Sequence, residues 1–375
     1  MTEQLKLKLN DSKATRWGAL VIVAFTMMAA YYVNDVVAPL KTMLETDLAW
    51  SSTDFGFFTG GYSFLNVFFL MLIWGGLILD RFGIRFTGKL ATIQMVGGTA
   101  LEYYAMTGLA GADATLFGIN EIFGYKTGVF VAFAGYSIFG VGAEVAGITV
   151  SKIIAKWFKG KELATAMGVQ VALARIGSQA GYAVAIPLAR AFGISTPVLL
   201  GLVLLLGGMI AFFIFAVMDK KLDKQMEAAA IAAGTEDEEE KFSFKDVKNI
   251  LVNPGFWLIA LLCVLFYSCV FPFQKFASEL MIIKYGINEN VAGTFAGLPA
   301  LGALILTPVF GGFIDKRGKS ASIMLLGSAM LICVHFIYAI PDINYWLVAI
   351  VLMIILGIAF SLVPSAMWPA VAKIF

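Results

Sequence analysis

The feature that most constrains this chain of 375 residues is a series of long apolar segments. About 20 apolar residues in a row are enough for a helix to cross a hydrocarbon layer of about 30 Å. Ten such segments can be marked, at 17–40, 55–79, 88–109, 127–150, 163–188, 196–218, 255–282, 291–314, 320–340 and 345–371. Only 14% of the residues are charged, against about 25% in soluble domains. The sequence therefore predicts an all-α membrane protein, because a backbone in lipid must satisfy its own hydrogen bonds.

The basic residues lie mostly on one side of these spans. They precede the first span and follow the second, fourth, sixth and eighth, whereas the opposite loops hold only Lys41, Lys126, Arg190 and Lys284. This bias predicts a cytoplasmic amino terminus. Residues 1–16 lack the apolar core of a signal peptide, so we expect the first span to be retained. No Asn-x-Ser/Thr acceptor lies in an outward loop, which favours a bacterial inner membrane over a lysosomal one.

Two charged turns interrupt the apolar pattern and resemble each other. The first is "GGLILDRFGIR", which begins at Gly75, and the second is "GGFIDKRGK", which begins at Gly311. The alignment that places Asp80 on Asp315 also matches Gly76 with Gly311, Arg81 with Lys316, and Gly83 with Gly318. The repeat predicts two similar halves, a six-helix bundle at 1–218 and a four-helix bundle at 255–375. A polar cytoplasmic linker at 219–254 joins them.

The first turn resembles the signature turn between helices 2 and 3 of the major facilitator superfamily, and the second resembles its partner in the other half. The resemblance covers essentially the whole chain. It implies two pseudo-symmetric helical bundles, a central cavity and alternating access by rocking. We expect Gly76 to let a neighbouring helix approach closely. Asp80 is expected to accept hydrogen bonds from Arg81, Arg85 or Lys156 and to latch one conformation.

The carboxyl-terminal segment "SAMWPAVAKIF" matches "VSKIIAKWF" at the exit of the fourth span. The chain is therefore expected to stop after four helices of the second half. In terms of the superfamily pattern, helices 11 and 12 are then absent.

Two ionisable residues stand out at membrane depth, where each charge costs about 2.5–3.5 kcal/mol. Glu144 lies on the fourth span among small residues, and Arg175 lies near the middle of the fifth, with Gln179 and Tyr182 on its face. Held apart, the two would bind the ammonium and carboxylate groups of a zwitterion such as a dipeptide, because the planar guanidinium group suits a carboxylate. Alternatively, they neutralise each other as a structural pair.

Further polar residues could line the same cavity. Tyr31 and Asp35 lie on the first span, Lys275 on the seventh, and Trp368 near the end of the tenth. Each also has a structural interpretation: Lys275 can pair with Glu279 one turn later, Asp35 can be solvated, and Trp368 can pack between helices. His335, the single histidine, is expected to pack on the ninth span, and the three cysteines are expected to be buried free thiols.

Three stretches, "GVGAEVAGITVSKIIAKWFKGKELATAMG", "ALARIGSQ" and "PSAMWPAVA", also resemble one branch of the superfamily, the lysosomal dipeptide transporter and its bacterial relatives. In that branch a glutamate and an arginine in these segments take the two ends of the peptide. The resemblance implies those roles for Glu144 and Arg175 and suggests a uniporter.

Alternatives remain open. An organic-anion carrier would use Arg175 and Lys275 as a cationic clamp, and a proton-coupled carrier would let Glu144, Asp35 or Glu102 titrate. The chain could also be a non-transporting membrane partner or scaffold. An enzyme is disfavoured, because no nucleophile, histidine pair or metal-ligand set is present. We expect no cofactor, no metal and no nucleic acid; the expected partners are a small solute and membrane lipid.

Overall fold

A computed structural model describes residues 8–111, 114–233 and 250–374. All ten predicted spans coincide with helices. The chain divides into two compact units, Met1–Glu236 and Asp237–Phe375. The domain boundaries predicted from the repeat stay a prediction.

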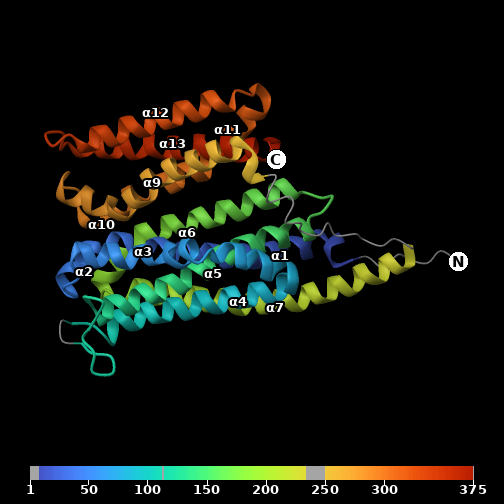
Figure 1. Ribbon diagram of the computed structural model, residues 1–375, viewed down its shortest axis with the longest axis horizontal. Helices are drawn as coiled ribbons and strands as arrows, with labels where there is room; N and C mark the ends of the chain where they lie inside the picture. Colours follow the sequence, from blue (N-terminus) through green and yellow to red (C-terminus); the bar gives the residue numbers. More distant parts are fainter. Residues whose placement is uncertain (1–7, 112–113, 234–249, 375) are drawn as a thin grey trace. The chain divides into compact units, whose positions relative to one another are not determined.

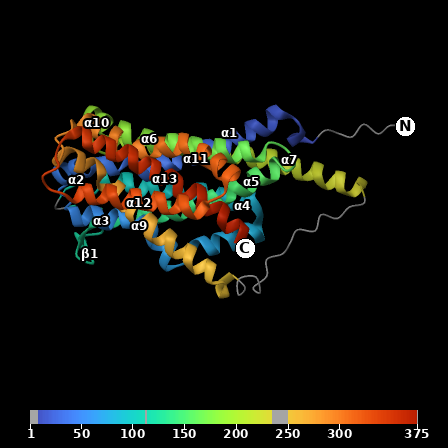
Figure 2. The same cartoon turned by 90° about the horizontal axis from the view of Figure 1, so that it is seen from above.

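The first unit is a bundle of long helices with a small hairpin (Figure 1). In chain order its elements are η1 (Leu9–Asp11), α1 (Lys13–Val36), η2 (Ala38–Leu40), α2 (Lys41–Asp47), α3 (Ser52–Phe68), α4 (Met71–Thr107), β1 (Glu121–Ile122), β2 (Tyr125–Lys126), α5 (Thr127–Trp157), α6 (Leu163–Phe192) and α7 (Thr196–Ala233). α5 packs against α3 and α4, and α1 packs against α6 and α7. α7 runs past the end of the bundle in both views (Figures 1 and 2), so part of the segment predicted as a linker is helical.

The second unit has a smaller set of helices in the part of the chain described. They are α9 (Pro254–Ile283), α10 (Glu289–Ala296), α11 (Leu298–Arg317), α12 (Ser320–Ala339) and α13 (Trp346–Ile374). α13 packs against α11 and α12. Ile314, Ile323, Leu362 and Ala366 form an apolar cluster between these three helices.

Both charged turns bend the backbone at a glycine. Gly83 interrupts α4 with a φ of 74°, and Gly318 ends α11 with a φ of 65°. These left-handed conformations favour glycine, because a Cβ would clash with the backbone. The repeat seen in the sequence is thus also a repeat of backbone geometry.

Seven of the described helices are long and apolar enough to cross a membrane, or eight spans if bent α3 and α4 count as one. Ten spans were predicted. The three predicted spans beyond these seven are the two in the bent pair of α3 and α4, and α6. The middle of α6 is less apolar than that of the other spans, because it holds Arg175, Ser178 and Gln179. A polar stripe in the middle of a spanning helix marks a candidate functional face.

Candidate functional site

Glu144 is held by a tyrosine from the neighbouring helix. It is half-buried on α5, and its carboxylate accepts a 2.7 Å hydrogen bond from the hydroxyl group of Tyr62 on α3. The two helices come close because Gly140, one turn before Glu144, has no side chain. A Cβ at Gly140 would lie 2.4 Å from the carbonyl oxygen of Tyr62. The Tyr62 hydroxyl thereby fixes the orientation of the carboxylate.

Arg175 lies against an aromatic ring in a similar way. Its guanidinium carbon is 5.7 Å from the centroid of the Tyr31 ring on α1. Gly177 permits the close approach of α6 to α1, since a Cβ there would lie 2.1 Å from the carbonyl oxygen of Met28. Attraction between a cation and a ring face is worth more in a site that excludes water. The ring of Tyr31 therefore helps to hold the Arg175 head group.

Asp35 is the third charged group in this region. The hydroxyl group of Ser178 on α6 donates to one of its carboxylate oxygens, and the amide of Asn34 donates to the other at 2.8 Å. Tyr136 of α5 donates in turn to the main-chain carbonyl oxygen of Asn34 at 2.7 Å. The Asp35 carboxylate is thus oriented by groups from two helices.

These groups form one neighbourhood around Tyr31. Arg175 contacts the ring of Tyr31 on α1, and Ser178, three residues later on α6, donates to Asp35, which lies one turn after Tyr31. Two acids and one base therefore lie on helices that pack together inside the first unit: Arg175 on α6, Asp35 on α1 and Glu144 on α5. Such a set can bind a cationic group and an anionic group of one small molecule.

The other predicted site residues are placed differently. Gln179 is half-buried on α6, whereas Tyr182 on the same helix is almost fully buried, so it packs inside the unit. Lys275 is half-buried on α9, one turn before Glu279, and Trp368 on α13 is 55% exposed. Both belong to the second unit, so their place beside Glu144 stays a prediction.

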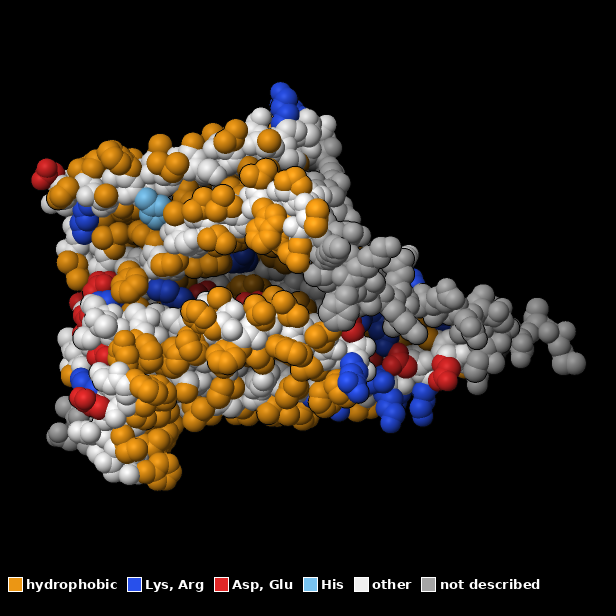
Figure 3. Space-filling model, in the orientation of Figure 1, with side chains coloured by type: hydrophobic (Ala, Val, Ile, Leu, Met, Phe, Trp, Pro, Cys, Tyr) orange, Lys and Arg blue, Asp and Glu red, His pale blue; other side chains and the backbone are white. Residues whose placement is uncertain are grey.

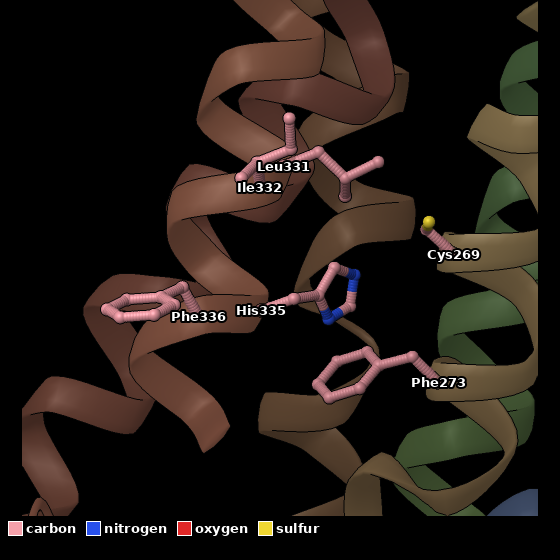
Figure 4. Close-up of a pocket in the computed structure, with 6 residues that line it drawn as sticks. All are labelled: Cys269, Phe273, Leu331, Ile332, His335 and Phe336. Carbon is pink, nitrogen blue, oxygen red and sulfur yellow. The ribbon is translucent and has the colours of Figure 1, made fainter. Parts of the chain in front are cut away.

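His335 packs as expected. Its ring lies between α12 and α9 and meets Phe273 edge to face, with the ring centroids 4.9 Å apart (Figure 4). Apolar side chains, among them Leu331 and Phe336, line the small pocket around it. The three cysteines are free, but the prediction that all are buried was wrong. Cys269 and Cys333 are exposed, because they lie on surfaces of α9 and α12 that are left uncovered.

The partner predicted for Asp80 was wrong. Its carboxylate accepts a 2.9 Å bond from Lys152 of α5, not from Arg81, Arg85 or Lys156. The bend at Gly83 separates the two sides of the turn. Arg81 lies near the ring of Phe82 on the exposed side.

Arg85 and Lys156 bind acids of α7 that the sequence analysis assigned to the linker. Arg85 is 3.2 Å and Lys156 is 2.8 Å from Asp219, which also accepts a 3.0 Å bond from the indole of Trp157. Both cations also contact Asp223. Asp219 is fully buried. The four-residue spacing of the two acids, one helical turn, was the signal that could have revealed this network.

Within the first charged turn, the glycine in close contact is Gly75 and not Gly76. A Cβ at Gly75 would lie 2.6 Å from Val145, whereas no described atom lies within 4 Å of a Cβ at Gly76. In the second turn, Gly311 is equally open and Lys316 is exposed. The side chain of Asp315 lies outside the described residues, so its predicted role stays a prediction.

The start of the chain is tied to the loop between α5 and α6. Arg16 donates to both carboxylate oxygens of Glu162 at 3.0 Å, and Lys161 donates to Asp11 at 2.9 Å. The hydrogen bond from Lys161 holds the pKa of Asp11 below its ordinary value. The pKa of Glu162 is lowered first by its own backbone amide and then by Arg16. Together with Asp80 and Asp219, these contacts concentrate charge at one end of the unit.

The surface shows the same division. Hydrophobic side chains cover the flank of the first unit, whereas Lys and Arg gather at the end where α7 extends (Figure 3). This distribution suits a bundle whose flanks face lipid and whose end faces water.

Comparisons with known proteins agree on the fold. The sequence profile of the Major Facilitator Superfamily matches residues 20–375. The lysosomal dipeptide transporter MFSD1 of Homo sapiens is 28% identical over 373 residues, which cover 96% of this chain and 73% of that protein. The MFSD1 of Gallus gallus is 32% identical over 251 residues, 64% of this chain and 54% of that protein.

Among solved structures, the xylose transporter XylE from E. coli has a TM-score of 0.62 at 16% identity, covering 96% of this chain and 87% of that chain. Tetrameric PepTSo2 has a TM-score of 0.62 at 12% identity, covering 93% and 82%. At these identities the likeness concerns the fold alone. The predicted all-α fold of two helical bundles is thereby confirmed.

Proposed function

This chain belongs to the major facilitator superfamily, and we propose that it carries dipeptides or similar small zwitterionic solutes across a membrane. That it is a multi-pass membrane transporter follows from the family match over residues 20–375. The substrate class rests mainly on one observation: Arg175, Glu144 and Asp35 lie on three helices that pack together, α6, α5 and α1, with the Arg175 guanidinium group against the ring of Tyr31. The MFSD1 relatives, named as dipeptide transporters, support the same class.

In this proposal Arg175 binds the substrate carboxylate. A guanidinium group presents two parallel N–H donors, which match the two oxygens of a carboxylate. The ring of Tyr31 lies on one side of the guanidinium group and limits the positions that it can adopt. Less conformational entropy is then lost when the substrate binds.

Glu144 binds the substrate ammonium group. The Tyr62 hydroxyl donates to one oxygen of the Glu144 carboxylate and leaves further lone pairs to accept from the substrate. Asp35, whose carboxylate accepts a hydrogen bond from Ser178 of α6, adds a second negative charge to the site. Gln179 is proposed to contact the peptide backbone, and Lys275 and Trp368 to complete the site from the second unit.

Transport would proceed by alternating access, with the two charged turns as conformational latches. The Asp80–Lys152 bond joins α4 to α5 next to the bend at Gly83. The bend at Gly318 is proposed to act equivalently in the second unit. Small rocking motions of rigid bundles are the usual way in which such folds expose a central site alternately.

The charged end of the first unit is proposed to face the cytoplasm, in a bacterial inner membrane. It carries Arg16, Arg85, Lys152 and Lys156 together with the amino terminus of α1. An excess of Lys and Arg marks the cytoplasmic side of membrane proteins. Labelling of a cysteine introduced at Lys152 by a membrane-impermeant reagent, in intact and in opened cells, tests this orientation.

Thermal unfolding in detergent with a panel of solutes tests the substrate class, because a ligand that binds the folded state raises its apparent stability. We expect dipeptides with free termini to raise the melting temperature. Dipeptides with an acetylated amino terminus or an amidated carboxyl terminus should not.

Variants of Arg175 and Glu144 test which residue binds the carboxylate and which binds the ammonium group of the substrate. Arg175→Ala should abolish the shift, whereas Arg175→Lys should keep part of it, because the charge remains and the planar fork is lost. Glu144→Gln should weaken the binding of dipeptides and leave dicarboxylate binding unchanged. Equal shifts with dicarboxylates and dipeptides in the unaltered protein would favour the anion carrier instead. Absence of any shift would favour a non-transporting partner.

A further inference from the structure

The segment between α4 and α5 contains two successive tight turns of the same kind. In the first, Leu116 and Ile119 exchange both backbone hydrogen bonds at 3.0 Å across Phe117 and Gly118. In the second, Ile122 pairs with Tyr125 across Phe123 and Gly124. All four central residues have positive φ, between 53° and 80°. This is the geometry of type I′ hairpin turns.

Phenylalanine is an unusual choice at these positions. The first central residue of a type I′ turn favours Asn, Asp or Gly, because bulkier side chains are strained in the left-handed region. Here both turns have Phe there, and both rings project into the surroundings: Phe117 is 94% and Phe123 is 88% exposed. Rings this exposed bury little apolar area within the chain, so they do little to offset the strain of the turns.

The hairpin is held firmly at its base. The ring of Tyr125 stacks on that of Phe57 of α3, with centroids 3.8 Å apart. Thr127 donates through its hydroxyl group to the carbonyl oxygen of Ile119 at 2.8 Å, and Lys126 donates to the carbonyl oxygen of Ala49. The positions of the two exposed rings are therefore defined relative to the helices.

The direction of the hairpin indicates what the rings meet. It leaves the bundle where α4 ends and α5 begins, and it projects to the side of the helix axes in two perpendicular views (Figures 1 and 2). A loop that pointed along the axes would enter water, whereas one that points sideways from the end of a span runs along the membrane surface. Segments that lie in the membrane interface bury side chains such as Phe, Trp and Leu about 5–10 Å deep, at the boundary between headgroups and acyl chains.

We propose that the tandem turns at Phe117 and Phe123 form an interfacial anchor that inserts both rings between the lipid headgroups of the outer leaflet. The surface is continuous with the lipid-facing flank, since the ring of Phe123 lies 5.9 Å from that of Phe130 on α5. The anchor holds the outer end of the α4–α5 pair at a defined depth. This role is independent of the solute.

Spin-label accessibility in the full-length protein tests the anchor. Cysteine is introduced at Phe117 or Phe123 after Cys263, Cys269 and Cys333 are replaced by alanine, and the labelled protein is placed in vesicles of phosphatidylethanolamine and phosphatidylglycerol. Collisions with oxygen, which is concentrated in lipid, are compared with collisions with a water-soluble nickel chelate. Glu121→Cys on the same hairpin provides the aqueous control, and Ile210→Cys on the exposed flank of α7 the lipid control.

We expect the oxygen-to-nickel ratio at 117 and 123 to exceed that at 121 several-fold and to approach that at 210. Ratios equal to that at 121 would place the rings in water and overturn the proposal. Low accessibility to both reagents, or dipolar broadening between labels, would show that protein, including a second copy of this chain, covers the turns; that too would overturn it.

A double variant separates anchoring from folding. Phe117→Asn with Phe123→Asn places favoured residues in both turns, so the melting temperature in detergent should stay the same or rise. In vesicles, a label at Ile119→Cys should become more accessible to nickel in this variant than in the parent. Unchanged nickel accessibility at that position would contradict the anchor.

Discussion

The hydroxyl group of Tyr62 donates a 2.7 Å hydrogen bond to the carboxylate of Glu144 across the α3–α5 contact. The bond exists because Gly140 brings the backbone of Tyr62 against α5. Tyr62, which was not among the site residues predicted from the sequence, thus positions Glu144, the residue proposed to bind the substrate ammonium group.

Tyr62→Phe should therefore weaken dipeptide binding about tenfold or more, because a hydrogen bond to a charged group is worth about 1.5–3 kcal/mol. Titration of the melting temperature with a dipeptide measures the change. Tyr31→Phe is the matched control: it removes a hydroxyl group but keeps the ring against Arg175, so affinity should change little. Equal losses in the two variants would contradict a specific role for Tyr62.

Asp219→Asn should be one of the most destabilising single changes in the first unit. It removes charge-assisted hydrogen bonds from Arg85, Lys156 and Trp157 to a fully buried carboxylate, and a hydrogen bond to a charged group is worth about 1.5–3 kcal/mol. Asp223→Asn touches the same two cations, but its side chain is 40% exposed, so the cost should be about 0–1 kcal/mol. Thermal unfolding of both variants in one detergent measures the contrast; similar melting temperatures would refute it.

The contact between Asp11 and Lys161 should make stability depend on pH in acid. The pKa of Asp11 is lower in the folded chain than its ordinary value of 3.8, chiefly because Lys161 donates to it. Its contribution is thus complete above that value and is lost as the pH falls below it. Asp11→Asn should lower the melting temperature at neutral pH but not in strong acid. The effect should stay within about 1 kcal/mol, since the pair is exposed. A difference that grew on acidification would contradict this sign.

Gly75→Ala and Gly76→Ala should differ despite being neighbours. The new methyl group at 75 would meet the branched side chain of Val145 at 2.6 Å, whereas the position at 76 is open within the described structure. Overpacking of this kind costs about 1–3 kcal/mol. We expect a lower melting temperature for Gly75→Ala only. Loss of transport in Gly76→Ala with an unchanged melting temperature would support a conformational latch at Gly76. A melting temperature lowered as much as in Gly75→Ala would contradict the open space found around Gly76.

Periodicity and composition were sufficient for much of the architecture. All ten predicted spans are helical, because length and apolarity decide whether a segment can satisfy its backbone in lipid. The repeated turns were also visible, since each requires glycine at a left-handed position, as at Gly83 and Gly318. Contacts between helices were predicted less well. Asp80 was expected to bond to Arg81, Arg85 or Lys156, but its partner is Lys152. The span that became α7 was expected to end at residue 218, just before the ion network at Asp219.

By itself, the sequence determined the class of the protein, its helical segments and the placement of Glu144 and Arg175 inside long apolar helices, because these properties depend on local composition and spacing. The tertiary structure alone decided which side chains meet: Tyr62 with Glu144, Tyr31 with Arg175, and Asp219 with Lys156. Such pairs depend on the rotation and separation of whole helices. That rotation and separation are set by close contacts between helices, such as the contact of Gly177 on α6 with Met28 on α1. The spacing of residues along the chain does not reveal which residues of another helix such a contact brings near.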